Sequence, residues 1–158
     1  MAAVSGWKVR KVNGLSVRLL YRCRQGIGVI VKSRKRKTVL IIEDEIDISS
    51  FVARVLELEG YDVLQAGDGE KGIMIARGNQ VSLVLLDIRL PGCDGWAVLS
   101  EFNSEPALSE IPVVMLTASV AESQQEKALG MGAAGYLVKP LSAGRLRKAV
   151  ANVLSGEG

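Results

Sequence analysis

Apolar runs alternate with helical patterns along this chain from about residue 38 onward. Short, strand-like apolar segments read VLIIE (39–43), YDVLQA (61–66), SLVLLD (82–87), IPVVMLTA (111–118) and AGYLVKP (134–140). Between and after them, apolar positions recur at 3.6-residue spacing and predict helices over about 48–56, 70–77, 96–103, 122–131 and 143–154. Five strands that alternate with five helices predict an α/β domain whose parallel sheet is covered by helices on both faces.

Charge divides the chain into two unlike parts. The first 42 residues contain eleven Lys and Arg and no acid, whereas the remainder carries a net charge of −8, so the overall value of +3 hides the contrast. The basic run KSRKRK (32–37) stands directly before the first apolar strand. We therefore expect a domain boundary there, with 1–37 a basic extension that lacks regular structure and 38–158 the folded domain.

Three absences limit the function classes. The chain has no histidine, which removes Ser-His-Asp and Cys-His catalysis, imidazole metal ligands and a phosphohistidine on this chain. Its two cysteines, Cys23 and Cys93, are too few for a disulfide framework and fit a reducing, cytoplasmic compartment. The longest apolar run near the start, 27–31, is far shorter than the ~20 residues that span a bilayer, so no membrane partner is expected.

Polar residues end the predicted strands, where a parallel α/β sheet binds its ligands. The first strand ends in Glu43-Asp44, the third in Asp87, the fourth in Thr117 and the fifth in Lys139-Pro140. Two carboxylates ~4 Å apart repel by about 4 kcal/mol at an effective dielectric constant of ~20, so a positive group must join them. Mg²⁺ suits hard oxygen ligands with open positions, and Lys139 supplies a second positive charge.

These segments resemble the receiver domain of two-component response regulators. The matching pieces are VLIIEDE, LLDIRLPGCDGW, VVMLTA and GYLVKP, in family order and over about three quarters of the chain. The resemblance implies a flavodoxin-like, doubly wound (βα)5 fold with strand order 2-1-3-4-5. It also implies a phosphorelay signalling module, not an enzyme in the metabolic sense, that accepts a phosphoryl group from a sensor histidine kinase and loses it slowly by autodephosphorylation.

The resemblance also implies a role for each residue of the site. Asp87 is the phosphoacceptor, Asp44 and Asp87 bind Mg²⁺ directly, Glu43 acts through water, and the main-chain carbonyl of Arg89 completes the protein ligands. Thr117 and Lys139 hold the phosphoryl oxygens, small Ala118 leaves the pocket open, Tyr136 is the aromatic switch residue, and the Lys139-Pro140 bond is cis. The pair Glu43-Asp44 departs mildly from the more frequent Asp-Asp, although the longer arm still reaches a metal through water.

Two ways of passing on the signal stay open, and so does a different hypothesis, a dinucleotide-binding site. Because the chain stops soon after the last helix, output is expected to pass through a partner that binds the fourth helix, fifth strand and fifth helix, or through relay to a histidine phosphotransfer domain. Gly67-Asp68-Gly69-Glu70-Lys71-Gly72 matches the dinucleotide fingerprint G-x-G-x-x-G. The simpler interpretation is that Asp68 caps the second helix, since the first strand ends in acids that would repel a pyrophosphate.

The basic extension permits several interpretations. Its positive charge could bind nucleic acid through residues 8–37, and its Arg-rich, acid-free composition overlaps that of organelle transit peptides. A tail without a specific role is the simplest interpretation.

Overall fold

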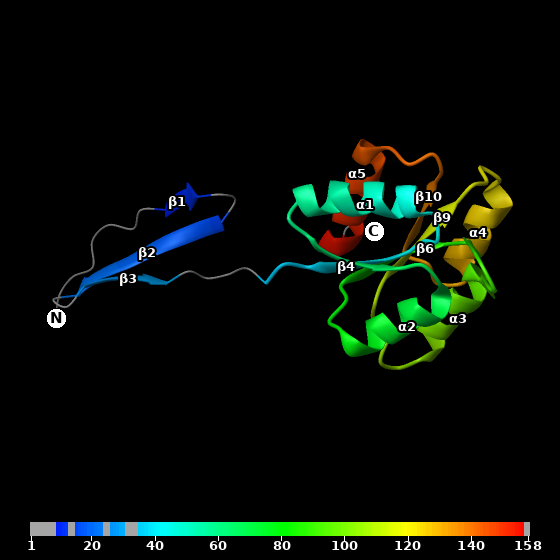
Figure 1. The fold of residues 1–158 in the computed structure, drawn as a ribbon, viewed down its shortest axis with the longest axis horizontal. Helices are drawn as coiled ribbons and strands as arrows, with labels where there is room; N and C mark the ends of the chain where they lie inside the picture. Colours follow the sequence, from blue (N-terminus) through cyan, green and yellow to red (C-terminus); the bar gives the residue numbers. More distant parts are fainter. Residues whose placement is uncertain (1–8, 13–14, 24–25, 31–34, 157–158) are drawn as a thin grey trace. The chain divides into compact units, whose positions relative to one another are not determined.

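The computed structural model describes residues 9–12, 15–23, 26–30 and 35–156, and these form two units, 1–35 and 36–158 (Figure 1). The predicted boundary between residues 37 and 38 therefore lies two residues from the observed one. Each unit is described by itself below.

The first unit contains an antiparallel three-stranded sheet in the order β1-β2-β3. Its strands are β1 (Val9–Val12), β2 (Leu15–Cys23) and β3 (Gly26–Ile30), with a register shift between Leu19 and Arg22. The sequence analysis expected no regular structure here, and the described residues differ from that expectation. The charge count suggested a solvated tail, but apolar and β-branched residues interleave with the basic ones, and such segments favour extended strands.

The second unit is a five-stranded parallel sheet with helices on both faces (Figure 1). Its sheet order is β10-β9-β6-β4-β5, and when only these five strands are numbered along the chain the order read from β5 is 2-1-3-4-5, as predicted. The elements are β4 (Thr38–Ile42), α1 (Ile46–Leu58), β5 (Asp62–Ala66), α2 (Gly69–Gly78), β6 (Leu83–Asp87), β7 (Arg89–Leu90), β8 (Cys93–Asp94), α3 (Gly95–Ser104), β9 (Val113–Thr117), α4 (Glu122–Gly130), β10 (Gly135–Val138) and α5 (Ala143–Ser155).

Two apolar clusters, one on each face, hold the helices to the sheet. Side chains of β4 alternate between them, since Val39 and Ile41 join α1 and α5 whereas Leu40 and Ile42 join α2 and α3. The three inner strands β4, β6 and β9 are buried along almost their whole length, which explains their near-continuous apolar sequence. Because the core fixes these strands, the residues at their carboxyl ends have fixed positions.

A side-chain cap starts α2, as the sequence suggested. The Asp68 carboxylate accepts a hydrogen bond from the Lys71 N–H at 2.8 Å and caps α2. Gly92 has φ 69° in the turn after Pro91, a backbone conformation that favours glycine, and the flanking residues form the short ladder β7-β8, which was not predicted.

Candidate functional site

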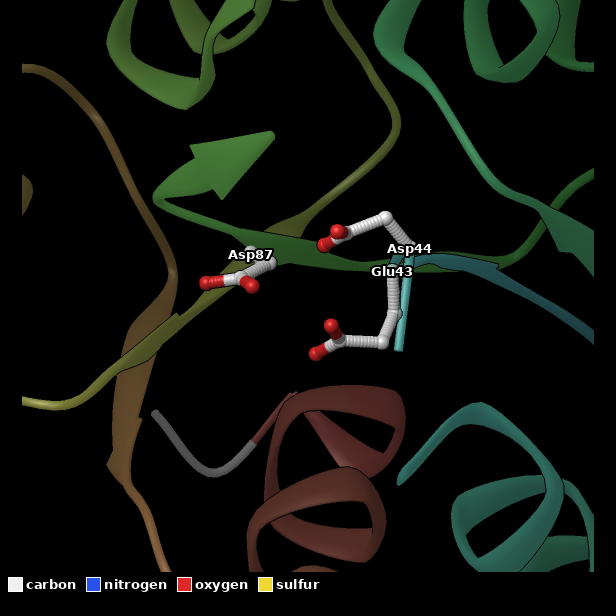
Figure 2. A group of neighbouring side chains, drawn as sticks. All are labelled: Glu43, Asp44 and Asp87. Atoms are coloured by element: carbon white, nitrogen blue, oxygen red, sulfur yellow. The ribbon is translucent and has the colours of Figure 1, made fainter. Parts of the chain in front are cut away.

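Three carboxylates converge at the carboxyl end of the parallel sheet (Figure 2). Glu43 and Asp44 follow β4, and Asp87 is the last residue of β6, the neighbouring strand. One oxygen from each side chain can be chosen so that all three lie within 4.8 Å of one another. Glu43 and Asp87 are buried at 2% and 4% exposure, whereas Asp44 is exposed.

This cluster has the composition of a hard-cation site. Carboxylate oxygens are the ligands that Mg²⁺ prefers, and an exposed member leaves one side open to water or to a phosphate. Packing three negative charges this closely is unfavourable unless a cation compensates them. The residues present therefore fit a divalent metal ion.

Lys139 brings a positive charge to the same place from the end of β10. Its Nζ lies 2.8 Å from Glu43 Oε2, 2.9 Å from Asp87 Oδ2 and 3.7 Å from Glu45 Oε1. The Lys139 side chain is 14% exposed, so water screens these contacts only partly. The peptide bond to Pro140 is cis, as the sequence analysis expected. Lys139 thus bridges the two buried carboxylates.

Burial and pairing shift the pKa values of this ion pair. Burial raises the pKa of the Glu43 carboxyl above 4.5, although hydrogen bonds from Lys139 and from the Glu45 N–H oppose the shift. Burial alone would lower the pKa of the Lys139 ammonium, but its hydrogen bonds to Glu43 and Asp87 outweigh that effect and raise the pKa above 10.5. Lys139 is consequently charged at every physiological pH.

The backbone orients both buried carboxylates. The Glu45 N–H donates to Glu43 Oε1 at 3.1 Å, and the Arg89 N–H donates to Asp87 Oδ1 at 3.1 Å. Each carboxylate therefore has one oxygen toward a main-chain donor and one toward Lys139. Such charge-assisted contacts restrict the rotamers of the side chains and hold their free lone pairs in the site.

Gly95, the first residue of α3, was not singled out by the sequence analysis. A Cβ built there would lie 2.3 Å from the carbonyl oxygen of Asp87 and 2.7 Å from Ile88 Cα. The Gly95 N–H also donates to the Ile88 carbonyl at 2.9 Å. Only glycine lets α3 approach the end of β6 this closely. The signal was present in CDGW, where a helix cap directly precedes a glycine.

Thr117, Ala118 and Tyr136 lie on or next to the last two strands of the sheet, and none of the contacts described for them joins the acidic cluster. Thr117 ends β9 and is 3% exposed. Its hydroxyl donates to Gln124 Oε1 at 3.3 Å and accepts from the Ser119 N–H at 3.0 Å. Ala118 is exposed, and Tyr136 is partly buried against the core. The structure thus unites Glu43, Asp44, Asp87 and Lys139, and pairs Thr117 with α4.

The glycines at 67–72 serve helix packing. A Cβ at Gly72 would lie 2.3 Å from Ile42 Cδ1, and one at Gly69 would lie 2.6 Å from Val98 Cγ2. The Asp68 carboxylate already occupies the start of α2, where a dinucleotide pyrophosphate would bind. These contacts favour the capping interpretation over the dinucleotide site.

The sheet order and the acidic strand ends define a flavodoxin-like α/β domain with a ligand site at the carboxyl edge of its sheet. The family model of the response regulator receiver domain matches residues 39–151, so the chain belongs to that family. The domain is therefore a receiver of two-component signalling.

Known proteins agree with this assignment. A "probable transcriptional regulator ycf27" of Porphyridium aerugineum is 36% identical over 76% of this chain and 49% of its own length. The "DNA-binding dual master transcriptional regulator RpaA" of a Synechocystis species is 41% identical over 65% of this chain and 42% of its length. The chain therefore spans about half the length of these curated relatives. Among solved structures, the Vibrio cholerae chemotaxis protein CheY4 is 26% identical with a TM-score of 0.71, covering 75% of this chain and 98% of that one.

Within the described part of the chain, no helix is both long and apolar enough to cross a bilayer.

Proposed function

We propose that this receiver accepts a phosphoryl group on Asp87 from a sensor histidine kinase, in a reaction that depends on Mg²⁺. The supporting observation is the position of the Asp87 carboxylate, which belongs to the acidic cluster at the strand ends and lies 2.9 Å from the Lys139 ammonium. Phosphoryl transfer needs a nucleophile, a metal site and a second cation near one point, and these residues supply all three.

The residues for the metal are Glu43, Asp44, Asp87 and the main-chain carbonyl of Arg89. Glu43 acts through water, as the resemblance to the family implies, and its oxygens keep their contacts with the Glu45 N–H and Lys139. When bound, Mg²⁺ neutralises negative charge on the phosphoryl oxygens.

The covalent step takes place on one Asp87 oxygen. That oxygen forms a bond to phosphorus as the bond from phosphorus to the donor nitrogen breaks, and the electron pair of that bond leaves with the donor imidazole. Lys139 then exchanges its contact with Asp87 Oδ2 for one with a phosphoryl oxygen, and the Thr117 hydroxyl donates to another. Ala118 leaves room for this group because its side chain is a single methyl.

The phosphoryl group changes the surface formed by α4, β10 and α5, including Tyr136. Phosphorylation adds roughly −1.5 to −2 charges, which redirect Thr117 and Lys139. The output is binding of a target protein to this surface. A phosphotransfer intermediate that passes the group to a histidine phosphotransfer domain is the alternative. Transfer of labelled phosphate from the receiver to such a domain would favour the phosphotransfer function over binding of a target protein.

Acetyl phosphate tests the chemistry without any kinase. We expect the full chain, incubated with acetyl phosphate and Mg²⁺, to gain the mass of one phosphoryl group, and we expect Asp87→Asn or chelation of Mg²⁺ to abolish the gain. Asp94→Asn is the matched control, because it changes an exposed carboxylate that caps α3 and preserves a capping side chain. A mass gain that survives in Asp87→Asn would contradict the assignment of the phosphoacceptor.

A further inference from the structure

The Thr117 hydroxyl forms hydrogen bonds with residues outside the acidic cluster. It donates its proton to Gln124 Oε1 at 3.3 Å and accepts a hydrogen bond from the Ser119 N–H at 3.0 Å. Thr117 itself is 3% exposed, whereas Gln124 lies at an exposed position of α4. The hydrogen bond to Gln124 joins the residue that ends β9 to the first turn of α4.

A hydroxyl has one proton to donate. The acceptor at Gln124 and a phosphoryl oxygen on Asp87 therefore compete for the same donor. For Thr117 to donate to the phosphoryl group, its hydrogen bond to Gln124 must break. When this bond is mostly formed, a change that raises its equilibrium constant lowers the affinity of the site for the phosphoryl group by the same factor.

Helix α4 has few other contacts that fix its first turn. Within α4 the buried residue is Ala128, near its far end, and the N-cap position, Ala121, has no side chain that can cap the helix. The Gln124 N–H bonds to the Ala121 carbonyl at 3.1 Å, within the same turn. The Gln124 side chain is thus the link between this turn and the site.

We propose that Gln124 is a positioning residue that holds the Thr117 hydroxyl away from Asp87 and so stabilises the unphosphorylated state of the receiver. This inference rests on the proposed function, because it concerns the same phosphoryl site. Phosphorylation draws Thr117 from Gln124 and releases the first turn of α4, which couples the chemistry at Asp87 to one end of the output surface.

Beryllofluoride, which stands in for a phosphoryl group on Asp87, is the probe. We expect Gln124→Ala in the full chain to bind beryllofluoride with Mg²⁺ about two- to tenfold more tightly than the wild type by calorimetry, as expected for removal of one neutral hydrogen bond. Gln125→Ala is the matched control, because it deletes the same amide one residue along, where the side chain reaches the Val120 carbonyl at 3.5 Å instead of Thr117. Its affinity should equal that of the wild type.

A double-mutant cycle tests whether Gln124→Ala changes the affinity for beryllofluoride through Thr117. In the Thr117→Ala background the competing donor is gone, so adding Gln124→Ala should no longer change the affinity. Unchanged or weaker binding by Gln124→Ala, or an equal gain with and without Thr117, would overturn the role of Gln124 and leave the proposed function intact. A wild-type chain that binds no beryllofluoride would overturn the proposed function, and the role of Gln124 with it.

Discussion

At the scale of single residues, Lys139 determines how two carboxylates can remain buried. Its ammonium lies within 3 Å of Glu43 Oε2 and Asp87 Oδ2, and its side chain is largely shielded from water. Removing one member of a buried set of ion pairs leaves the other charges uncompensated, which is more unfavourable than replacing every charged member by an apolar residue. Lys139 therefore stabilises the site before any phosphoryl group arrives.

Lys139→Met should destabilise the domain near neutral pH by about 1.5 to 3 kcal/mol, the range for hydrogen bonds to charged groups. The deficit should narrow as the pH falls through the raised pKa of Glu43 toward 4.5, because protonation removes one of the uncompensated charges. Urea denaturation at several pH values measures both effects. Lys148→Met, at an exposed position of α5, is the control and should leave stability nearly unchanged. A deficit that is constant across this range would contradict the electrostatic explanation.

The direction of each pKa shift determines how the stability of the domain depends on pH. Because the pKa of Lys139 is raised in the folded state, its contribution is complete below 10.5 and is lost only as the pH rises through the folded pKa. Glu43, whose pKa is also raised, contributes most below 4.5 and less as the pH rises past its folded pKa. In the neutral range, then, the contribution of Lys139 to stability is complete, whereas that of Glu43 is smaller than at low pH.

Sequence reasoning located the strand-end residues and missed those that support them. Glu43, Asp87, Thr117 and Lys139 end apolar runs, and a parallel sheet brings such ends together, so their proximity follows from topology. Gln124 lies seven residues after Thr117 in a polar helix, and its contact depends on where α4 packs, which no local pattern specifies.

At the scale of elements, the start of α3 sets the end of β6. Gly95 allows the helix backbone to lie against the Asp87 carbonyl and Ile88, so the phosphoacceptor and the helix are positioned together. The contact atoms are main chain, and they cannot move aside by changing a rotamer.

Gly95→Ala should destabilise the domain by about 1 to 3 kcal/mol, the usual effect of overpacking, and should slow phosphorylation by acetyl phosphate because Asp87 shifts. Gly144→Ala in α5 is the control, since a Cβ there meets nothing within 4 Å and alanine favours the helix. Thermal denaturation and the rate of mass gain are the two measurements. If Gly95→Ala behaved like Gly144→Ala in both, the close approach would have no consequence for the site.

The pattern of apolar runs predicted the five helices and five parallel strands of the second unit, whereas the order of the strands in the sheet came from the resemblance to the family. Those signals are strong because buried strands are almost wholly apolar and helices bury a single stripe. The strands β7 and β8 were not predicted, because a segment of two residues is too short to show a periodic pattern. The strands of the first unit were missed because the charge of that segment was weighed above its interleaved apolar residues.

At the scale of the whole molecule, the chain consists of two units with opposite charge. The second unit begins at Arg36, which lies 3.7 Å from Asp62, and the next residue, Lys37, donates to the Leu154 carbonyl. Both contacts lie within the second unit, so the receiver includes its own basic entry segment.

Removal of residues 1–35 should leave Mg²⁺-dependent phosphorylation and the melting temperature of the receiver nearly unchanged, because every residue proposed for the site lies in the second unit. The same truncation should abolish salt-dependent retention on a DNA column if the extension binds nucleic acid. Retention equal to that of the full chain would contradict the nucleic-acid hypothesis, and loss of phosphorylation would contradict the independence of the receiver.

The apolar sequence of strand β4 also matters while the chain is still unfolded. Its residues Val39–Ile42 are fully buried in the finished sheet, and an apolar, β-branched segment of this kind associates with copies of itself when it is exposed in an unfolded chain. Basic residues 35–37 precede it and acidic residues 43–45 follow it. Charges that flank such a segment oppose aggregation. Glu43 and Asp44, proposed to serve the metal in the folded domain, thus also help to keep the newly made chain soluble.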